Sequence, residues 1–300
     1  MKYLRLIRVH QWIKNVFVFV PLLFSLHLFN QEFFLLTFFA FLVFCLASSL
    51  IYVINDLVDI ESDRAHPTKK NRPLPSGKIS KKSAVITASI LLVIVFFLMM
   101  YFNYEFILFT IGFILLNVIY SFWLKNIVLL DVFSIAAGFS IRVLAGAFVI
   151  QVPMSSWLLL TTMFISLFLG VMKRRSELVL VSENFYRNSD QSDRTENQSR
   201  KVLAQYSLNF ADQLATIAAA GVIICYALYT VAPRTISIFQ TERLIYTTPF
   251  VVFGIFRYMY LEYMSRKGEN TTRLLATDFP MIADVLIYIV ITVLIIYKII

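Results

Sequence analysis

The sequence predicts an all-α protein that crosses a membrane many times. Of its 300 residues, 59% are hydrophobic and only 15% are charged, which is more apolar surface than one soluble core can bury. The apolar residues gather in long runs, and a helix needs about 20 of them to cross the hydrocarbon core of a bilayer. The charged residues lie between the runs. We therefore expect a polytopic helical bundle that uses lipid as the solvent for its outer surface.

Runs of the required length predict about nine membrane-spanning helices. They cover residues 16–30, 33–54, 83–102, 105–124, 127–150, 155–172, 207–230, 244–263 and 279–299. The links at 30–32 and 103–104 are too short for a domain and predict tight helical hairpins. Two longer connections, about 55–82 and 173–206, predict loops on a single domain of residues 1–300.

The Lys and Arg residues fall almost entirely on one side of this nine-span plan. The crowded side holds Lys2, Arg5, Arg8, Lys14, Arg64, Lys69, Lys70, Arg72, Lys78, Lys81, Lys82, Lys125, Lys173, Arg174, Arg175, Arg187, Arg194, Arg200, Lys201, Arg266, Lys267 and Arg273. The opposite side holds only Arg234, Arg243 and Lys298. Cytoplasmic loops carry the excess of Lys and Arg. We therefore expect a multi-pass protein of the inner or plasma membrane, with its N-terminus and both long loops in the cytoplasm.

The net charge of +9 has the same origin. In a soluble protein such a charge would suggest a nucleic-acid partner. Here the positive residues cluster beside predicted spans, where they face anionic lipid and polar ligands. The sequence therefore predicts a membrane partner and no nucleic acid.

Four oxygen ligands stand at helical spacing where the second predicted span ends. If that helix continues, one face within an arc of about 100° carries Asn55, Asp56, Asp59 and Asp63. They spread over roughly 12 Å of helix, which suits Mg²⁺ that bridges carboxylates to a diphosphate rather than one closed cage. We predict all four as metal ligands and the three aspartates as catalytic residues. Glu61 and Arg64 point elsewhere.

A basic loop punctuated by prolines follows this acidic face, at residues 66–77. The prolines end the helix, and Lys69 and Arg72 can then approach the phosphates that the metal holds. The alternative is an ordinary solvated, salt-bridged loop at the end of a membrane helix.

Charged residues inside a predicted span usually face the bundle interior, because charge in lipid is costly. On the fifth span Asp131, Gly138 and Arg142 share one stripe within about 40°. Asp131 is a candidate for a metal or sugar-hydroxyl site, and the deeper Arg142 is a candidate phosphate anchor. Both charges can instead be structural and satisfied by neighbouring helices.

The fourth span presents a similar polar face near the cytoplasmic end. Its members are Asn117, Tyr120, Ser121 and Lys125. Ligand binding and hydrogen-bonded helix packing explain these residues equally well.

The acidic face and the run that follows it resemble a known family. The pattern Asn55-Asp56-x-x-Asp59-x-x-x-Asp63, followed by Arg72-Pro73-Leu74-Pro75-Ser76-Gly77, is similar to the first Asp-rich motif of the UbiA superfamily of intramembrane prenyltransferases. The resemblance covers essentially the whole chain. It implies a bundle of nine helices with an active-site mouth that faces the cytoplasm.

One departure from the family pattern points to a particular branch. The family places a second Asp-rich motif after the sixth span, where this chain has Lys173-Arg174-Arg175. Cations cannot ligate Mg²⁺, but they bind phosphate. Further stretches resemble the decaprenyl-phosphate phosphoribosyltransferase branch: Gln11-Trp12-Ile13-Lys14-Asn15, His66-Pro67-Thr68-Lys69, Gly138-Phe139-Ser140-Ile141-Arg142, Lys173-Arg174-Arg175-x-Glu177-Leu178 and Phe256-Arg257-Tyr258.

This resemblance implies a Mg²⁺-dependent transfer of 5-phosphoribose from phosphoribosyl pyrophosphate to a decaprenyl-type polyprenyl phosphate, with release of diphosphate. In that branch the product leads to arabinose-bearing cell-wall precursors. The residues we predict to bind the substrates are Lys14, Lys69, Arg72, Lys125, Asp131, Arg142, Lys173 and Arg174. A homo-oligomer is left open.

Two alternatives remain at this point. The first is an ordinary prenyltransferase that moves a polyprenyl group from its diphosphate to an aromatic acceptor, with Asp278 and Asp284 as relocated acids. The second is a non-catalytic binding protein or transporter that has kept the fold. Transporters often contain broken helices near the bilayer midplane and inverted repeats, and the sequence contains neither.

Overall fold

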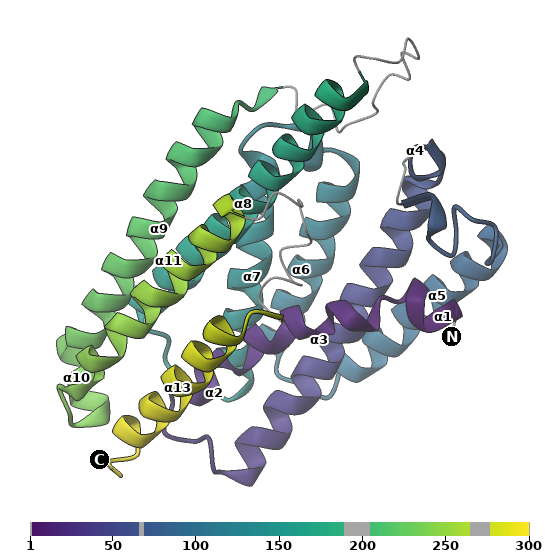
Figure 1. The fold of residues 1–300 in the computed structure, drawn as a ribbon. Helices are drawn as coiled ribbons and strands as arrows, with labels where there is room; N and C mark the ends of the chain where they lie inside the picture. Colours follow the sequence, from purple (N-terminus) through teal and green to yellow (C-terminus); the bar gives the residue numbers. More distant parts are fainter. Residues whose placement is uncertain (1, 66–68, 189–204, 265–276, 300) are drawn as a thin grey trace. The chain divides into compact units, whose positions relative to one another are not determined.

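The computed structural model describes residues 2–65, 69–188, 205–264 and 277–299, and within these ranges every regular element is a helix (Figure 1). The contacts divide the chain into two compact units, Met1–Met154 and Ser155–Ile300. A single functional domain of residues 1–300 stays a prediction. His66-Pro67-Thr68, the predicted loop residues 189–204, and the basic residues Arg266, Lys267 and Arg273 lie outside the described residues.

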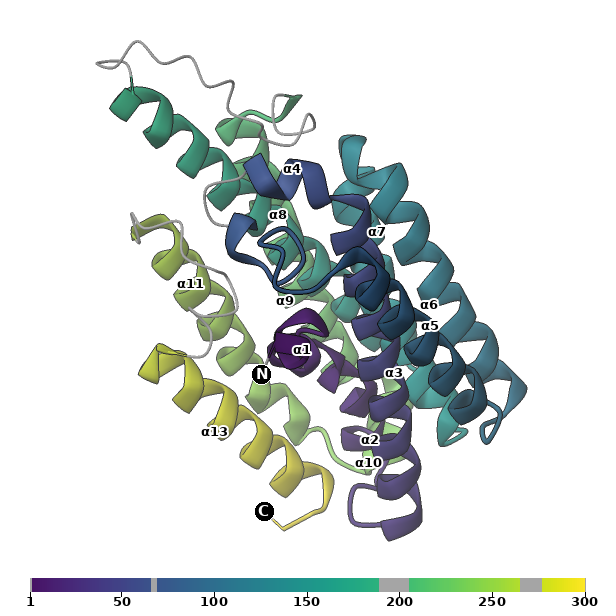
Figure 2. The same cartoon turned by 90° about the vertical axis from the view of Figure 1, so that its right-hand side faces the viewer.

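The first unit is built from long helices joined by short ones. Its elements are α1 (Lys2–Leu6), η1 (Val9–Phe19), α2 (Val20–Leu23), α3 (Gln31–Val58), α4 (Ile60–Ala65), η2 (Lys69–Asn71), α5 (Lys81–Met99), α6 (Tyr104–Phe122), η3 (Leu124–Asn126) and α7 (Leu130–Val149). The N-terminal segment from α1 to α2 packs against α3 and α7 (Figure 2). It therefore brings its own side chains to the acidic end of α3.

Polar side chains at the predicted hairpin links start the long helices. The Oδ1 atom of Asn30 accepts from the Glu32 amide at 2.9 Å and opens α3. At the next hairpin, Asn103 Oδ1 accepts from the Phe106 amide at 3.1 Å and opens α6. Such caps satisfy amides that have no partner inside the helix. The short link before α6 is at its predicted position. The start of α3 also lies where it was predicted, but the helix before it ends at Leu23, so the tight hairpin at 30–32 is wrong.

The first predicted span, residues 16–30, has a different structure. Residues Val9–Phe19 form the 3₁₀-helix η1, and the α-helical part is only Val20–Leu23. Tertiary contacts favour this conformation, because Trp12 Nε1 donates to Ser49 Oγ on α3 at 3.0 Å. Pro21, at the start of α2, has no amide hydrogen to extend the ladder behind it. Among the described residues, eight helices are long and apolar enough to span a membrane, and the count of nine spans stays a prediction.

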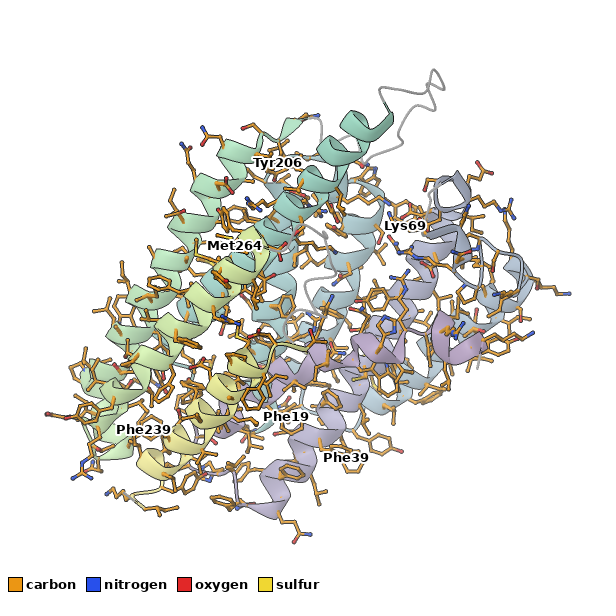
Figure 3. All side chains as sticks on the ribbon, in the orientation of Figure 1. Phe19, Phe39, Lys69, Tyr206, Phe239 and Met264 are labelled. Atoms are coloured by element: carbon orange, nitrogen blue, oxygen red, sulfur yellow. The ribbon has the colours of Figure 1, made fainter. Side chains whose placement is uncertain are left out.

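Aromatic side chains fill the core of the first unit. Phe44 packs against Phe106 and Phe113, with ring centroids 5.8 and 5.2 Å apart. On the outside of α3, Phe39 is 53% exposed and points away from the bundle (Figure 3), as expected of a lipid-facing residue. The burial pattern agrees with a bundle that is apolar inside and outside.

A glycine sets the distance between α7 and η1. A Cβ atom added at Gly146 would lie 2.1 Å from the carbonyl oxygen of Val18. No larger residue fits there without moving one of the two helices. This contact allows η1 to pack closely against α7 where the two helices cross.

The second unit contains the remaining long helices. Its elements are α8 (Ser156–Asn188), α9 (Leu208–Val231), α10 (Pro233–Phe239), η5 (Arg243–Thr247), α11 (Thr248–Met264) and α13 (Phe279–Ile296). The predicted loop 173–206 is thus too long, because α8 continues through 33 residues to Asn188. Lys, Arg, Glu and Leu are frequent in residues 173–180, and all of them favour helix when the chain leaves the apolar region.

Candidate functional site

The predicted acidic face begins at the last turn of α3. Asp59 closes this helix with φ −95° and ψ 12°, and α4 begins at the next residue. The Asp63 amide still donates to the Asp59 carbonyl oxygen at 2.8 Å. Helical hydrogen bonding therefore continues across the junction between α3 and α4. The four predicted ligands lie on this nearly continuous helical segment.

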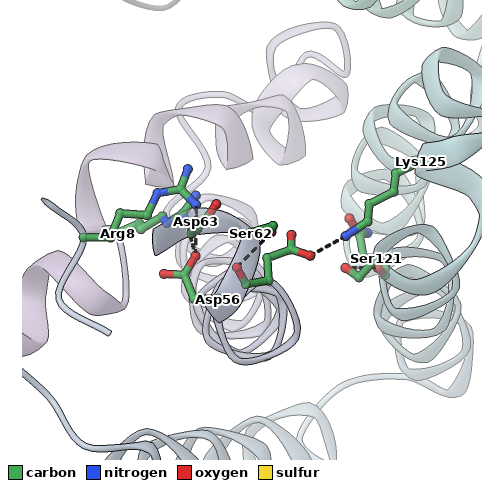
Figure 4. Close-up of polar contacts among 9 residues, drawn as sticks. Arg8, Asp56, Ser62, Asp63, Ser121 and Lys125 are labelled. Atoms are coloured by element: carbon green, nitrogen blue, oxygen red, sulfur yellow. Dashed lines mark hydrogen bonds and ion pairs between the residues drawn. The ribbon is translucent and has the colours of Figure 1, made fainter. Parts of the chain in front are cut away.

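Two arginines hold the carboxylates on one side of this path. Arg72 Nη1 lies 2.5 Å from Asp63 Oδ2 and 3.4 Å from Asp56 Oδ1, so it bridges them. Arg8 forms an ion pair with the same Asp56 oxygen (Figure 4). Arg8 adopts the left-handed conformation, with φ 51° and ψ 51°, which costs an L-residue about 1–2 kcal/mol. Arg8 thus forms the turn between α1 and η1, and its own side chain makes the contact with Asp56.

The remaining aspartate faces the other way. Asp59 Oδ1 accepts a hydrogen bond of 2.7 Å from Lys125 Nζ, which η3 supplies (Figure 4). The acids therefore divide into an Asp56–Asp63 pair with two arginines and an Asp59–Lys125 pair. We call these six residues the acidic-end network: Arg8, Asp56, Asp59, Asp63, Arg72 and Lys125.

Burial makes the arginine contacts energetically important. Asp56 is only 1% exposed. A charge removed from water is costly unless it is paired, and loss of one partner of a buried pair typically costs about 3–5 kcal/mol. Arg8 and Arg72 both contact Asp56 beside Asp63 and offer positive charge to compensate it.

The donor set of the acidic-end network fits the chemistry of magnesium, which prefers carboxylate oxygens. Among the residues that the structure describes, no three or more His, Cys, Asp or Glu side chains are grouped so that they could hold a metal ion by themselves. Oxygens of a bound diphosphate would have to complete the coordination. Magnesium binding by these residues stays a prediction.

A second polar cluster joins η1, α3 and α7. Asn15 Oδ1 accepts from Arg142 Nε at 2.7 Å and from Ser48 Oγ at 3.1 Å. Arg142 Nη1 donates to the Gly138 carbonyl oxygen at 3.0 Å. Arg142 is thus fixed by its own helix and by η1, as a residue facing the bundle interior.

Lys14 lies near this cluster and is partly buried. Removal from water, then repulsion by Arg142 and by Arg8, lowers the pKa of the Lys14 ammonium to about 8.

The other predicted substrate-binding residues of the first unit have separate surroundings. Lys69, in η2, is partly exposed, three residues before Arg72. Asp131 is buried in the first turn of α7. It stands 11 residues before Arg142, about 16 Å along the helix, so the two residues belong to different levels of the same stripe.

The basic residues of the second unit differ among themselves. Lys173 is exposed. Arg174 has 0% exposure and forms an ion pair of 2.5 Å with Glu177, one turn along α8. Phosphate binding by Arg174 stays a prediction, and it would require Glu177 to be displaced.

Arg175, which we did not predict as a site residue, ties three helices of the second unit together. Its Nε atom donates to Asp212 Oδ1 on α9 at 2.6 Å, and its guanidinium lies 3.8 Å from the centre of the Tyr263 ring on α11. The Tyr263 hydroxyl donates to the same Asp212 oxygen at 2.8 Å. This is a structural role for one of the bases that replace the second acidic motif.

The two relocated acids have other surroundings. Asp278 caps α13 by accepting from the Met281 amide at 3.0 Å, and it pairs with Arg257 at 2.9 Å. The hydrogen bonds from Arg257 hold the pKa of Asp278 below its usual value. Asp284 is buried on α13 against Gly254 of α11. These environments do not favour the aromatic prenyltransferase alternative.

Sequence reasoning missed Arg8 and Asn15 as members of the site. Both belong to the N-terminal segment, where Arg8 precedes the stretch Gln11-Trp12-Ile13-Lys14-Asn15 by three residues. That stretch carried the resemblance to one branch of the family. That resemblance was the signal available in the sequence. It did not show the partners of Arg8 and Asn15, because these lie on α3 and α7 and are reached only in the folded chain.

The helical bundle, with its clustered carboxylates and cations, places the chain in a class of multi-pass membrane transferases. The chain belongs to the UbiA prenyltransferase family, whose family model matches residues 16–176. The resemblance predicted from the Asp-rich motif is confirmed.

Several relatives carry the name of the predicted branch, and others are named 4-hydroxybenzoate octaprenyltransferase. The chain is 35% identical over 190 residues to the decaprenyl-phosphate phosphoribosyltransferase of Mycolicibacterium smegmatis, which covers 63% of the chain and 56% of that protein. The chain thus spans little more than half the length of this relative. It is 31% identical over 227 residues to the decaprenyl-phosphate phosphoribosyltransferase of Mycobacterium tuberculosis, covering 74% of the chain and 72% of the relative.

A solved structure shares the fold. A UbiA homologue from Archaeoglobus fulgidus bound to GPP and Mg²⁺ has a TM-score of 0.71, with 18% identity, over 99% of this chain and 100% of the other. At this identity the likeness concerns the fold alone.

Proposed function

We propose that the chain transfers 5-phosphoribose from phosphoribosyl pyrophosphate to a polyprenyl phosphate and releases diphosphate, in a Mg²⁺-dependent reaction. The observation that carries the proposal is the acidic-end network, in which every aspartate already contacts a cation. Such a site offers oxygens to a metal and positive charge to phosphates. The relatives named as decaprenyl-phosphate phosphoribosyltransferases support the choice of substrates.

When the donor binds, the aspartates and the cations of the acidic-end network would exchange each other for the metal and the phosphates. Asn55, Asp56, Asp59 and Asp63 would hold the metal, which when bound neutralises charge on the donor diphosphate. The cations Arg8, Arg72 and Lys125 then leave their carboxylates for phosphate oxygens. They stabilise the negative charge that develops on the departing diphosphate.

The bond changes need no strong general base. An oxygen of the acceptor phosphate, already an anion at neutral pH, forms a bond to C1 of the ribose. The bond from C1 to the diphosphate oxygen breaks, and its electron pair leaves with the diphosphate. The ribose gains oxocarbenium character as this bond stretches. The bundle acts mainly by positioning the two substrates.

The setting of the reaction follows from the charge distribution. We propose that the N-terminus and the acidic-end network face the cytoplasm, from which the soluble donor arrives, and that the acceptor tail stays in the bilayer. Lys69 and Lys173 are proposed as further phosphate contacts near the loops, and Asp131 as a contact to the sugar. The chain is proposed to work as one domain.

Two substrate pairs test the proposal with purified full-length protein in lipid nanodiscs. We expect diphosphate release that requires phosphoribosyl pyrophosphate, a polyprenyl phosphate and Mg²⁺ together. The second pair is a polyprenyl diphosphate with 4-hydroxybenzoate. Turnover of the second pair without the first would reject the proposal in favour of aromatic prenyl transfer.

A further inference from the structure

The cluster around Arg142 is separate from the acidic-end network and is held by uncharged partners. Asn15 uses its whole side chain there: Oδ1 accepts from Arg142 and Ser48, and Nδ2 contacts Cys45 Sγ at 3.4 Å. Arg142 has one further hydrogen bond, to its own helix. The guanidinium is therefore held in one orientation before any ligand binds.

The charges of this cluster are not balanced by acids. Within the described part of the chain, neither Lys14 nor Arg142 forms an ion pair with a carboxylate, whereas Arg8 contacts Asp56. Arg142 is only 8% exposed. Positive charge taken out of water is costly unless an anion compensates it. Lys14 directly precedes Asn15, the residue that holds Arg142 at 2.7 Å, and the two positive charges match the charge of one phosphate monoester dianion.

Aromatic rings surround the guanidinium. The Arg142 group lies 4.4 Å from the centre of the Phe113 ring and 5.0 Å from that of Phe139. Phe17 of η1 packs edge-on against Phe139 at 4.9 Å. These surroundings suit a phosphate carried on an isoprenoid chain better than one carried on a sugar, whose hydroxyl groups would need polar partners.

We propose that Lys14 and Arg142 form a second anion site, oriented by Asn15, that binds a phosphate monoester dianion, and that the occupant is the phosphate of the acceptor lipid. The inference rests on the proposed function for the identity of the lipid. It adds a division of labour: the acidic-end network takes the donor diphosphate, and the Lys14–Arg142 site takes the acceptor. Arg8, at the N-cap of η1, belongs to the first site, and Lys14, within η1, belongs to the second.

The site can be tested by binding alone, without turnover. Full-length protein in phosphatidylcholine nanodiscs, with EDTA and without donor, is titrated with farnesyl monophosphate, farnesol or ribose 5-phosphate. We expect farnesyl monophosphate to bind at least tenfold more tightly than either control compound. Lys14→Met and Arg142→Met should each weaken farnesyl monophosphate binding at least tenfold, and Lys14→Arg should retain it. The matched control is Lys82→Met, an exposed lysine on α5.

Each outcome decides the matter. Equal binding of farnesyl monophosphate to wild type and to Lys14→Met would overturn the site. Ribose 5-phosphate binding that depends on Lys14, with no preference for the isoprenoid, would overturn the acceptor assignment, because the site would then take the donor's 5-phosphate. If Arg142→Met does not fold, Lys14→Met and Lys14→Arg still decide.

The proposed function can fail independently. A Lys14-dependent farnesyl monophosphate site in a protein that does not transfer phosphoribose would keep the site and reject the reaction. A protein that transfers phosphoribose but shows no Lys14-dependent binding of farnesyl monophosphate would keep the reaction and reject the site.

Discussion

At the scale of single residues, the main feature is that the aspartates of α3 and α4 are all paired with cations. Asp56 contacts Arg8 and Arg72, and Asp59 contacts Lys125. A metal ion alone must compete with these cations for the carboxylates. A diphosphate draws the cations away, so we expect the metal and the diphosphate to strengthen each other's binding.

The first prediction concerns Asp59. Asp59→Asn removes a proposed metal ligand without changing the size of the side chain, and it should lower Mg²⁺-dependent transfer by about 10²-fold or more. Glu61→Gln is the matched control, since Glu61 is an exposed acid only two residues away, in α4. Initial rates of lipid labelling at saturating donor measure both. Near-normal transfer by Asp59→Asn would remove this residue from the metal site.

A second prediction concerns Arg8, which sequence reasoning missed. Arg8→Gln leaves the buried Asp56 carboxylate with one partner fewer, so the protein should lose stability by about 1–3 kcal/mol and lose transfer activity. Adding Asp56→Asn removes the uncompensated charge. The double variant should therefore recover most of the thermal stability but not the activity. Thermal unfolding in detergent measures the first effect, and equal unfolding temperatures for wild type and Arg8→Gln would contradict it.

A third prediction uses the pKa of Lys14, which is lowered from 10.5 to about 8. Below that pH the free protein carries the ammonium that attracts a phosphate, and above it the amine is neutral. Phosphate monoesters are already dianions there, because their second pKa is about 6. Affinity for farnesyl monophosphate should thus fall as pH rises from 7 to 9. In Lys14→Arg it should stay constant, and the same fall in that variant would exclude Lys14 as its cause.

The residues of the acidic face were predictable because their spacing is local. Helical periodicity placed Asp56 and Asp63 on one side, and the motif carried the magnesium prediction. Periodicity did not predict that Asp59 turns away from the other two toward Lys125. Arg8 and Asn15 were not predictable in the same way, since their partners lie 48 and 127 residues away in the sequence. Only the packing of η1 against α3 and α7 brings them into place.

At the scale of elements, the crossing of η1 and α7 controls the geometry of the Arg142 cluster. Gly146→Ala would place a methyl group 2.1 Å from the Val18 carbonyl oxygen, so the two helices must move apart. We expect a loss of stability of about 1–3 kcal/mol and weaker phosphate binding. Gly112→Ala is the control, because a Cβ atom there meets nothing within 4 Å. Unfolding temperatures of the two variants that do not differ would contradict the close crossing.

Helix boundaries were predictable where a polar cap follows an apolar run, as at Asn30 and Asn103. They were not predictable for the segment 9–30, where a hydrogen bond from Trp12 to Ser49 of α3 favours a 3₁₀-helix over a long α-helix. The end of α8 was also missed. Hydropathy marks where lipid contact ends, but a helix of good helix formers continues into water.

At the scale of the whole molecule, composition and charge asymmetry predicted a helical membrane bundle, and the Asp-rich motif predicted the family to which the chain belongs. What they did not predict is the separation of two kinds of polar site inside the first unit. One contains aspartates and cations together, and the other contains cations without acids. That difference is the physical basis for assigning donor and acceptor to different sites.

The central claim is that the ribose leaves its diphosphate and joins the lipid. Donor labelled with ¹⁴C in the ribose and with ³²P in the β-phosphate tests it directly, with polyprenyl phosphate and Mg²⁺ in nanodiscs. We predict that the ¹⁴C label enters the organic phase with the lipid, while the ³²P label stays in water as diphosphate. Both labels remaining in water, or both entering the lipid, would contradict the account.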